Sequence, residues 1–305
     1  MNEVIITLMN QVLIMFAMMM IGFVLYKFRI VDTDSTKAIS CIVLYIATPA
    51  TIFTSFLASF SVERLVNGVW AIGLSAAVLV MSILFVNIVF LKSNGLTKFG
   101  IVFNNVGFLG IPLVRNVLGE ESVFYMSLYV TMISFLVWTH GIYLVSGNKN
   151  EISISKVLRN PTIIMIAVGL IVFCLSIPIP SVISMTATYL GNLNAPLAMM
   201  VLGCYLAESN LKDLFRRKQT YIICAGRLLV IPALTLLMLH FVPSSLDNVR
   251  TVILIGSATP VAGLMGIFCQ KYGNDYAYGA GVVGLSTLLS LIMMPIFLWI
   301  FILLG

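Results

Sequence analysis

Apolar residues dominate the chain in ten long runs, which short polar segments separate. A helix that crosses a bilayer needs about 20 mainly apolar residues, and each run is close to that length. We therefore predict an all-α membrane protein with ten transmembrane helices. The predicted spans cover residues 4–26, 38–60, 66–91, 98–118, 122–146, 160–178, 183–207, 219–241, 250–270 and 276–303.

The composition excludes a soluble globular protein. Of 305 residues, 60% are apolar and 9% are charged, whereas soluble domains carry about 25% charged residues. The net charge of +6 comes from basic residues in short loops, a pattern typical of membrane orientation. The lipid bilayer is thus an expected partner and nucleic acid is not, and both ends are as apolar as the middle, so we expect no appended soluble domain.

The basic loop residues lie mostly on one side. Thirteen Lys and Arg residues fall in the odd-numbered loops. Only Arg64, Arg115 and Arg250 lie on the opposite side, and Arg227 lies inside a span. Positive loops stay in the cytoplasm. We expect a multi-pass protein of the cell (inner or plasma) membrane with both termini outside the cytoplasm.

The two halves of the chain resemble each other at an offset near 150. We predict a first five-helix repeat over residues 1–150 and a second over 151–305. Five is an odd number, so the second repeat enters the membrane from the opposite side, as in secondary transporters. The matched pairs are residues 10–25 with 160–175, Pro49 with Pro196, Pro112 with Pro260, and 130–144 with 286–300.

The fourth span of each repeat contains residues that interrupt helices. The stretch "NNVGFLGIP" (104–112) lies in span 4 and "GSATP" (256–260) lies in span 9. Proline removes a backbone donor and clashes with the preceding turn. Unwound backbone cannot face lipid, and paired interrupted spans indicate a transport site whose helix N-termini suit an anion. The candidate substrate-binding residues there are Asn104, Asn105, Gly107, Gly110, Pro112, Ser257, Thr259, Pro260 and Gly263.

The alternative interpretation of these segments is a pair of proline kinks with small residues for close helix packing. Arg227 also has two interpretations. It could neutralise a substrate carboxylate, or it could bond to carbonyls that the helix breaks leave free. We expect no metal site and no cofactor, because His140 and His240 are far apart and no cysteines form a C-x-x-C pair.

The motif "NVGFLGIPL" (105–113), followed by "VLGEES", resembles the fourth span of the auxin efflux carrier family, which includes malate and malonate permease-like proteins. "GRLLVIP" (226–232) is similar to the family's eighth span and "ATPVAGLMGIFCQKYGND" (258–275) to its ninth. The resemblance implies a homodimer, a scaffold of spans 1, 2, 6 and 7, and an elevator-type transport domain of spans 3–5 and 8–10. It also implies substrate at the crossing of spans 4 and 9, marked by Pro112 and Pro260, with Asn105 as the substrate-facing amide.

Two departures from the plant members of the family disfavour auxin as the substrate. Span 3 has no acidic residue, and the loop "SGNKNEISISKVLR" (146–159) is short. We predict a secondary transporter, and not an enzyme, that exports small organic anions such as dicarboxylates. The alternatives are a sodium- or proton-coupled symporter, on the model of the bile acid sodium symporter superfamily, and a membrane sensor or partner subunit.

Overall fold

The computed structural model describes residues 2–152 and 154–304, and this part of the chain is almost wholly helical. Its only extended pairing is an isolated antiparallel bridge between Asn104 and Val261. The helices of the first half are α1 (Asn2–Lys27), α2 (Thr33–Ile42), η1 (Val43–Ala47), α3 (Thr48–Ser55), α4 (Val62–Val89), α5 (Gly95–Val102), η2 (Val106–Gly110), α6 (Ile111–Leu118), α7 (Glu120–Leu136), η3 (Val137–Gly141), α8 (Ile142–Ser146) and η4 (Lys149–Glu151).

The second half likewise combines long helices with interrupted segments. Its helices are α9 (Ile154–Leu158), α10 (Pro161–Leu175), α11 (Ser181–Asn192), α12 (Asn194–Glu208), α13 (Leu211–Arg216), α14 (Lys218–Ala225), η5 (Gly226–Val230), α15 (Ile231–Leu239), η6 (Ser244–Leu246), α16 (Asp247–Ser257), α17 (Leu264–Lys271) and α18 (Tyr276–Leu304).

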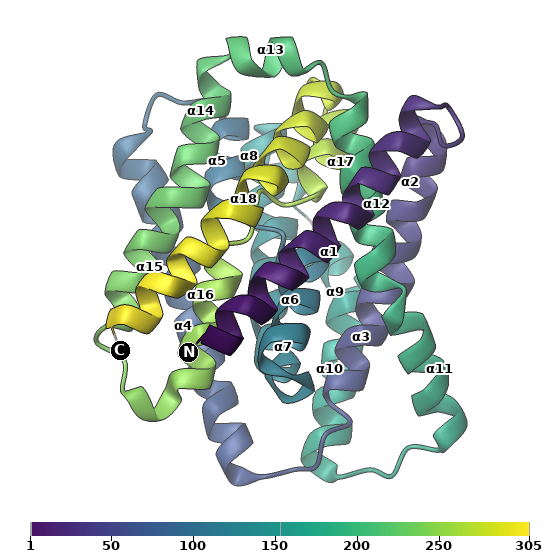
Figure 1. The fold of residues 1–305 in the computed structure, drawn as a ribbon, viewed down its shortest axis with the longest axis vertical. Coiled ribbons are helices and arrows are strands. Elements are labelled where there is room, and N and C mark those ends of the chain that lie inside the picture. Colours follow the sequence, from purple (N-terminus) through teal and green to yellow (C-terminus); the bar gives the residue numbers. More distant parts are fainter. Residues whose placement is uncertain (1, 153, 305) are drawn as a thin grey trace.

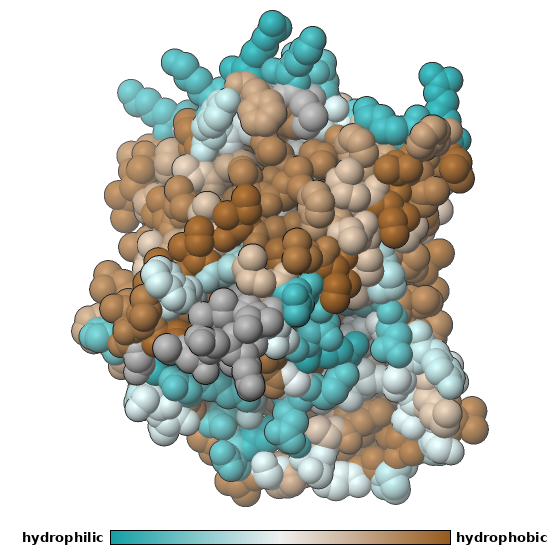
Figure 2. All heavy atoms as spheres, viewed as in Figure 1, coloured by the Kyte–Doolittle hydropathy of each residue, from teal (hydrophilic) through white to brown (hydrophobic). Residues whose placement is uncertain are grey.

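Seven helical stretches in the described residues are long and apolar enough to cross a membrane. They coincide with seven predicted spans, with ends that differ by five residues at most. The other three predicted spans are different: 160–178 becomes the shorter helix α10, and 98–118 and 250–270 are each interrupted. Figure 2 shows a broad apolar band, with polar side chains projecting beyond it near α13, the edge that carries a basic loop.

Side-chain caps set several helix starts. The side chains of Asp32, Ser61, Asn94 and Asn160 accept backbone N–H bonds at the first turns of α2, α4, α5 and α10. Such residues satisfy donors that a helix start leaves free. At the turn between α6 and α7, Gly119 has a φ of 88°, a conformation that favours glycine.

Prolines explain three of the four π-helical segments in the described part of the chain. Segments η1, η2 and η5 each end two residues before a proline, namely Pro49, Pro112 and Pro232. A proline ring clashes with the carbonyl four residues earlier, and the wider π turn moves that carbonyl aside. The helices therefore continue through these prolines. Pro295 lies inside α18 without such a segment.

The helices form two groups (Figure 1). Helices α1–α3 pack with α10–α12, and α4–α8 pack with α14–α18. Within the first group α1 and α12 approach very closely: a Cβ atom on Gly22 would lie 2.0 Å from the carbonyl oxygen of Met200, and one on Gly203 would lie 1.9 Å from that of Met19. Only glycine permits this backbone contact, as at other close helix crossings in membranes.

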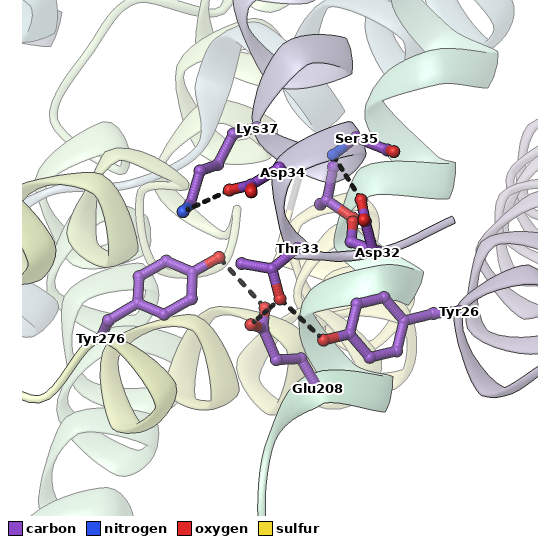
Figure 3. A network of polar contacts seen from close by, with 9 residues as sticks. Tyr26, Asp32, Thr33, Asp34, Ser35, Lys37, Glu208 and Tyr276 are labelled. Atoms are coloured by element: carbon purple, nitrogen blue, oxygen red, sulfur yellow. Dashed lines mark hydrogen bonds and ion pairs between the residues drawn. The ribbon is translucent and has the colours of Figure 1, made fainter. Parts of the chain in front are cut away.

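A polar network joins the two groups near the start of α18 (Figure 3). Glu208, the last residue of α12, accepts hydrogen bonds from the hydroxyls of Thr33 (2.7 Å) and Tyr276 (3.1 Å). The Thr33 hydroxyl also lies 3.0 Å from the Tyr26 hydroxyl. We call Tyr26, Thr33, Glu208 and Tyr276 the Glu208 network. It connects α1, α2 and α12 to α18.

Candidate functional site

The two interrupted spans cross each other through their backbones. Span 4 loses helical geometry between Val102 and Val106, and span 9 between Ser257 and Leu264. At the crossing, the N–H of Asn105 donates to the Pro260 carbonyl (2.8 Å). The N–H of Ala262 donates to the Phe103 carbonyl (3.0 Å). Each unwound segment therefore satisfies backbone groups of the other, which is what unwound backbone inside a membrane requires.

Asn104 joins the crossing to its surroundings through its side chain. Its Nδ2 donates to the Gly256 carbonyl (2.6 Å) and more weakly to the Tyr129 hydroxyl (3.4 Å). A carbonyl only accepts, so this bond fixes which end of the amide faces Gly256. The Oδ1 of Asn104 is buried and accepts no hydrogen bond from the described residues. A buried acceptor without a donor is costly and indicates a place for a ligand or water.

A cavity of about 80 Å³ lies beside the crossing. Asn105 contributes a buried Nδ2 that donates to no acceptor in the described residues, and its side chain is 6% exposed. Among the residues that the structure describes, no lysine, arginine or acidic side chain lines this cavity. The lining residues are Leu44, Thr48, Asn104, Asn105, Gly107, Phe108, Val130, Ile133, Ser134, Val137, Thr162, Ala262, Gly263 and Leu264.

At the crossing, the C-terminal helix ends lie beside Arg227 and the N-terminal helix ends lie at the cavity. Arg227 is 1% exposed and donates to the carbonyls of Ile101 and Val102 (both 3.1 Å) and of Ser257. These carbonyls are the C-terminal ends of α5 and α16, so the guanidinium offsets their partial negative charge. By contrast, the N-terminal ends of η2 and α17, which carry partial positive charge, meet at the cavity.

The structure favours the second interpretation of Arg227, in which it bonds to carbonyls that the helix breaks leave free. Its terminal nitrogens bond to such carbonyls, and it does not line the cavity.

The other candidate residues fall into two groups, those that line the cavity and those that bond within the helix end. Asn104, Asn105, Gly107 and Gly263 line the cavity. Ser257 and Thr259 donate to carbonyls of their own helix end, Leu254 and Gly256, and a Cβ on Gly110 would meet Thr259 at 3.4 Å.

The expectation that Pro112 marks the crossing requires correction. Pro260 lies there, but Pro112 lies seven residues beyond Asn105, in the first turn of α6. The helix runs on from η2 into α6, because the π turn at Val106–Gly110 accommodates the proline. The bridge instead sets Asn104 opposite Val261. The matched prolines are thus not equivalent in their distance from the crossing.

Several cavity residues were not among the candidate substrate-binding residues, although Thr48 is visible in the sequence as a polar residue within a span, where it could line a cavity or satisfy neighbouring backbone. Thr48, Ser134 and Thr162 add hydroxyl groups from three other spans, and Phe108 adds an aromatic wall. Ser134 is one of the identities between residues 130–144 and 286–300, which was a usable signal. Thr48 is a polar residue before a proline in an apolar run, which is a weak signal. Thr162 follows a proline at a helix start, where a threonine is ordinary, so the sequence gives no signal for it.

A helical multi-pass membrane protein whose two interrupted helices cross beside a small cavity with a few buried polar side chains has the design of a membrane transporter. The comparison with known families agrees: the model of the membrane transport protein family matches residues 7–298. The chain belongs to this family, the auxin efflux carrier family that the span-4 motif resembles. An uncharacterized transporter of Methanocaldococcus jannaschii is 27% identical over an alignment of 314 positions that covers 96% of this chain and 98% of the relative.

Proposed function

We propose that the protein is a secondary transporter of small organic anions such as dicarboxylates, and that the anion binds in the cavity at the crossing. The observation that carries the proposal is the buried Asn105 Nδ2, which donates to no acceptor among the described residues and lies beside two helix N-termini. Buried donors are nearly always paired. A carboxylate would accept from the Asn105 amide and from free N–H groups of the helix ends.

The electrostatics of the crossing support an anion. Arg227 offsets the C-terminal ends of α5 and α16 on one side of the crossing. Within the described chain, the N-terminal ends of η2 and α17 have no acidic side chain beside them in the cavity. Their partial positive charges act in a region with little water, where such charges are weakly screened.

We further propose the architecture in which this site works. The chain forms ten spans as two inverted five-helix repeats, each with its fourth span interrupted. Spans 1, 2, 6 and 7 form the scaffold of a homodimer, and spans 3–5 and 8–10 move as an elevator. The mutual backbone bonds of the two interrupted spans support a shared site at the repeat interface. We also propose, from the distribution of basic loop residues, that both termini lie outside the cytoplasm.

The proposed direction is export. An inside-negative membrane potential favours exit of an anion by ~2.3 kcal/mol per charge per 100 mV, so efflux needs no coupled ion. Uptake by the same site would need a coupled cation or an exchanged anion.

The test is malonate flux in proteoliposomes at imposed potentials. We expect labelled malonate to move above the level of protein-free liposomes, and Asn105→Ala to lower this flux at least about tenfold, the effect of one lost charge-assisted hydrogen bond. The control is Asn87→Ala, an exposed asparagine on α4, which should behave as the unaltered protein. Flux of neutral or cationic solutes alone would overturn the anion assignment, and an unaffected Asn105→Ala protein would overturn the site.

A sodium- or proton-coupled symporter is the second candidate. The buried Oδ1 of Asn104 accepts no hydrogen bond from the part of the chain that the structure describes, and oxygen acceptors suit hard cations. This function predicts malonate flux that requires sodium or an inward proton gradient, whereas a uniporter responds to the potential alone.

A further inference from the structure

The carbonyl of Gly107 has lost its donor within the helix. In a π turn a carbonyl accepts from the N–H five residues on, and at η2 the N–H of Ile111 donates to the carbonyl of Val106. The next carbonyl is that of Gly107, and the residue five positions on is Pro112. Proline has no N–H. The π turn that accommodates Pro112 therefore leaves the Gly107 carbonyl without a backbone donor from its own helix, beside the cavity.

Asn194 supplies that donor from a different group of helices. It is the first residue of α12 and is 2% exposed. Its Nδ2 donates to the Gly107 carbonyl at 3.2 Å. An asparagine at a helix start commonly caps its own helix, but here the amide extends 87 positions back along the chain, to span 4.

Thr48 determines which end of this amide faces Gly107. Its hydroxyl donates to the Oδ1 of Asn194 at 3.0 Å, which leaves Nδ2 to point at the carbonyl. Thr48 itself lines the cavity, and a Cβ on Gly107 would lie 3.6 Å from its Cγ2 methyl group. The relay thus runs from a cavity hydroxyl on α3, through the amide on α12, to the backbone of η2.

We propose that Asn194 is a positioning residue of the transport site: it holds the Gly107 carbonyl that Pro112 deprives of a donor, and so sets the N-terminal end of η2 against the cavity. The inference rests on the proposed function for its link to substrate. Asn194 touches the backbone of η2 and acts on substrate through it. Because α12 belongs to the proposed scaffold and η2 to the transport domain, the bond exists only while these two lie as they do here.

The first test needs no substrate. Asn194→Ala removes the amide that serves the Gly107 carbonyl, and we expect it to lower the unfolding temperature in detergent by roughly 2 °C. In a Pro112→Ala background, the substituted position regains a backbone N–H that can donate to that carbonyl. The loss caused by Asn194→Ala should then fall to less than about half. Equal losses in both backgrounds would overturn the assignment of the Gly107 carbonyl to Asn194.

The second test separates positioning from stability. We expect Asn194→Ala to raise the malonate concentration for half-maximal flux about tenfold, which corresponds to ~1.4 kcal/mol, without lowering the maximal rate. Thr48→Val, which removes the hydroxyl that orients the Asn194 amide, should also raise this malonate concentration. Thr48→Ser keeps a hydroxyl, so its malonate dependence should stay close to that of the unaltered protein. The control is Asn116→Ala, which removes an amide-to-carbonyl bond within α6, to the carbonyl of Pro112, and should leave the malonate dependence unchanged.

The outcomes are distinguishable. If Asn194→Ala and Asn116→Ala shift the malonate dependence equally, or if neither shifts it, Asn194 is structural and the positioning role is wrong. If the unaltered protein moves no malonate, the proposed substrate class fails, and the unfolding-temperature comparison with Pro112→Ala still decides whether Asn194 serves the Gly107 carbonyl.

Discussion

Replacing Arg227 distinguishes its two interpretations. Arg227→Met retains much of the side chain's apolar volume and removes its donors. Three buried carbonyls, those of Ile101, Val102 and Ser257, then lose a charged donor. One buried group left without its partner costs about 1–3 kcal/mol, and such losses are not additive. We expect a total destabilisation of about 3–5 kcal/mol, the range for breaking a buried charged contact.

The assay is thermal unfolding in detergent, followed by malonate binding to the protein that remains folded. A destabilisation of this size should lower the unfolding temperature by roughly 5–10 °C. Arg227→Lys should be intermediate, because an ammonium group keeps the charge but lacks the planar fork that reaches separate carbonyls. Folded Arg227→Met protein should still respond to malonate. An unchanged unfolding temperature with malonate binding lost would refute this reasoning and make Arg227 a substrate-binding residue.

Three further substitutions test packing and the cavity. Gly203→Ala places a Cβ against the backbone of α1, and a cost of about 1–3 kcal/mol should appear as a lower unfolding temperature. Gly263→Ala sets a methyl group about 3.6 Å from the Asn105 amide, and should raise the half-maximal malonate concentration without lowering that temperature. Asn105→Asp adds a negative charge to the cavity, so malonate flux should be lost, whereas retained flux would contradict an anion in contact with this side chain.

The interruption of spans 4 and 9 was predictable because its causes are local. Glycines, amides and prolines in an apolar run disfavour a regular helix at any depth. The position of the break was not predictable from the prolines alone. Pro260 lies at the crossing and Pro112 lies seven residues beyond Asn105, yet both follow a similar pattern of small and apolar residues. The difference is the π turn before Pro112, which depends on how η2 packs.

Which residues line the cavity depends on contacts between helices, and the sequence of a single span does not reveal these contacts. Asn104 and Asn105 carry a visible signal, since adjacent amides are costly in a membrane helix. Thr48 and Thr162 come from spans that look like ordinary apolar helices, and they reach the cavity only because α3 and α10 pack beside α7. Asn194 is visible in the sequence as a polar residue within a span, which could satisfy neighbouring backbone, but its acceptor is not visible, because the Gly107 carbonyl is free only as a consequence of Pro112.

Helix α12 bonds to the other group of helices at both of its ends. Asn194 donates to Gly107 at its start, and Glu208 accepts from Tyr276 at its end. The two residues are 14 positions apart, which is about 20 Å along a helix. If the transport domain slides past α12, both hydrogen bonds must break in each cycle, since neither donor can follow its acceptor over such a movement.

This geometry predicts the combined effect of substitutions at the two ends of α12 on the maximal rate of malonate transport. Glu208→Gln weakens the bond to Tyr276 by removing its charge, and Asn194→Ala removes the bond to Gly107. Each should raise the maximal malonate rate by a factor of about three to five, because each destabilises the state seen here by about 1 kcal/mol relative to the barrier. Sites this far apart act independently, so the double variant should show the product of the two factors. A Glu208→Gln protein that unfolds at a lower temperature but transports no faster would mean that the Glu208 network stays intact throughout the cycle, with α18 moving together with α12.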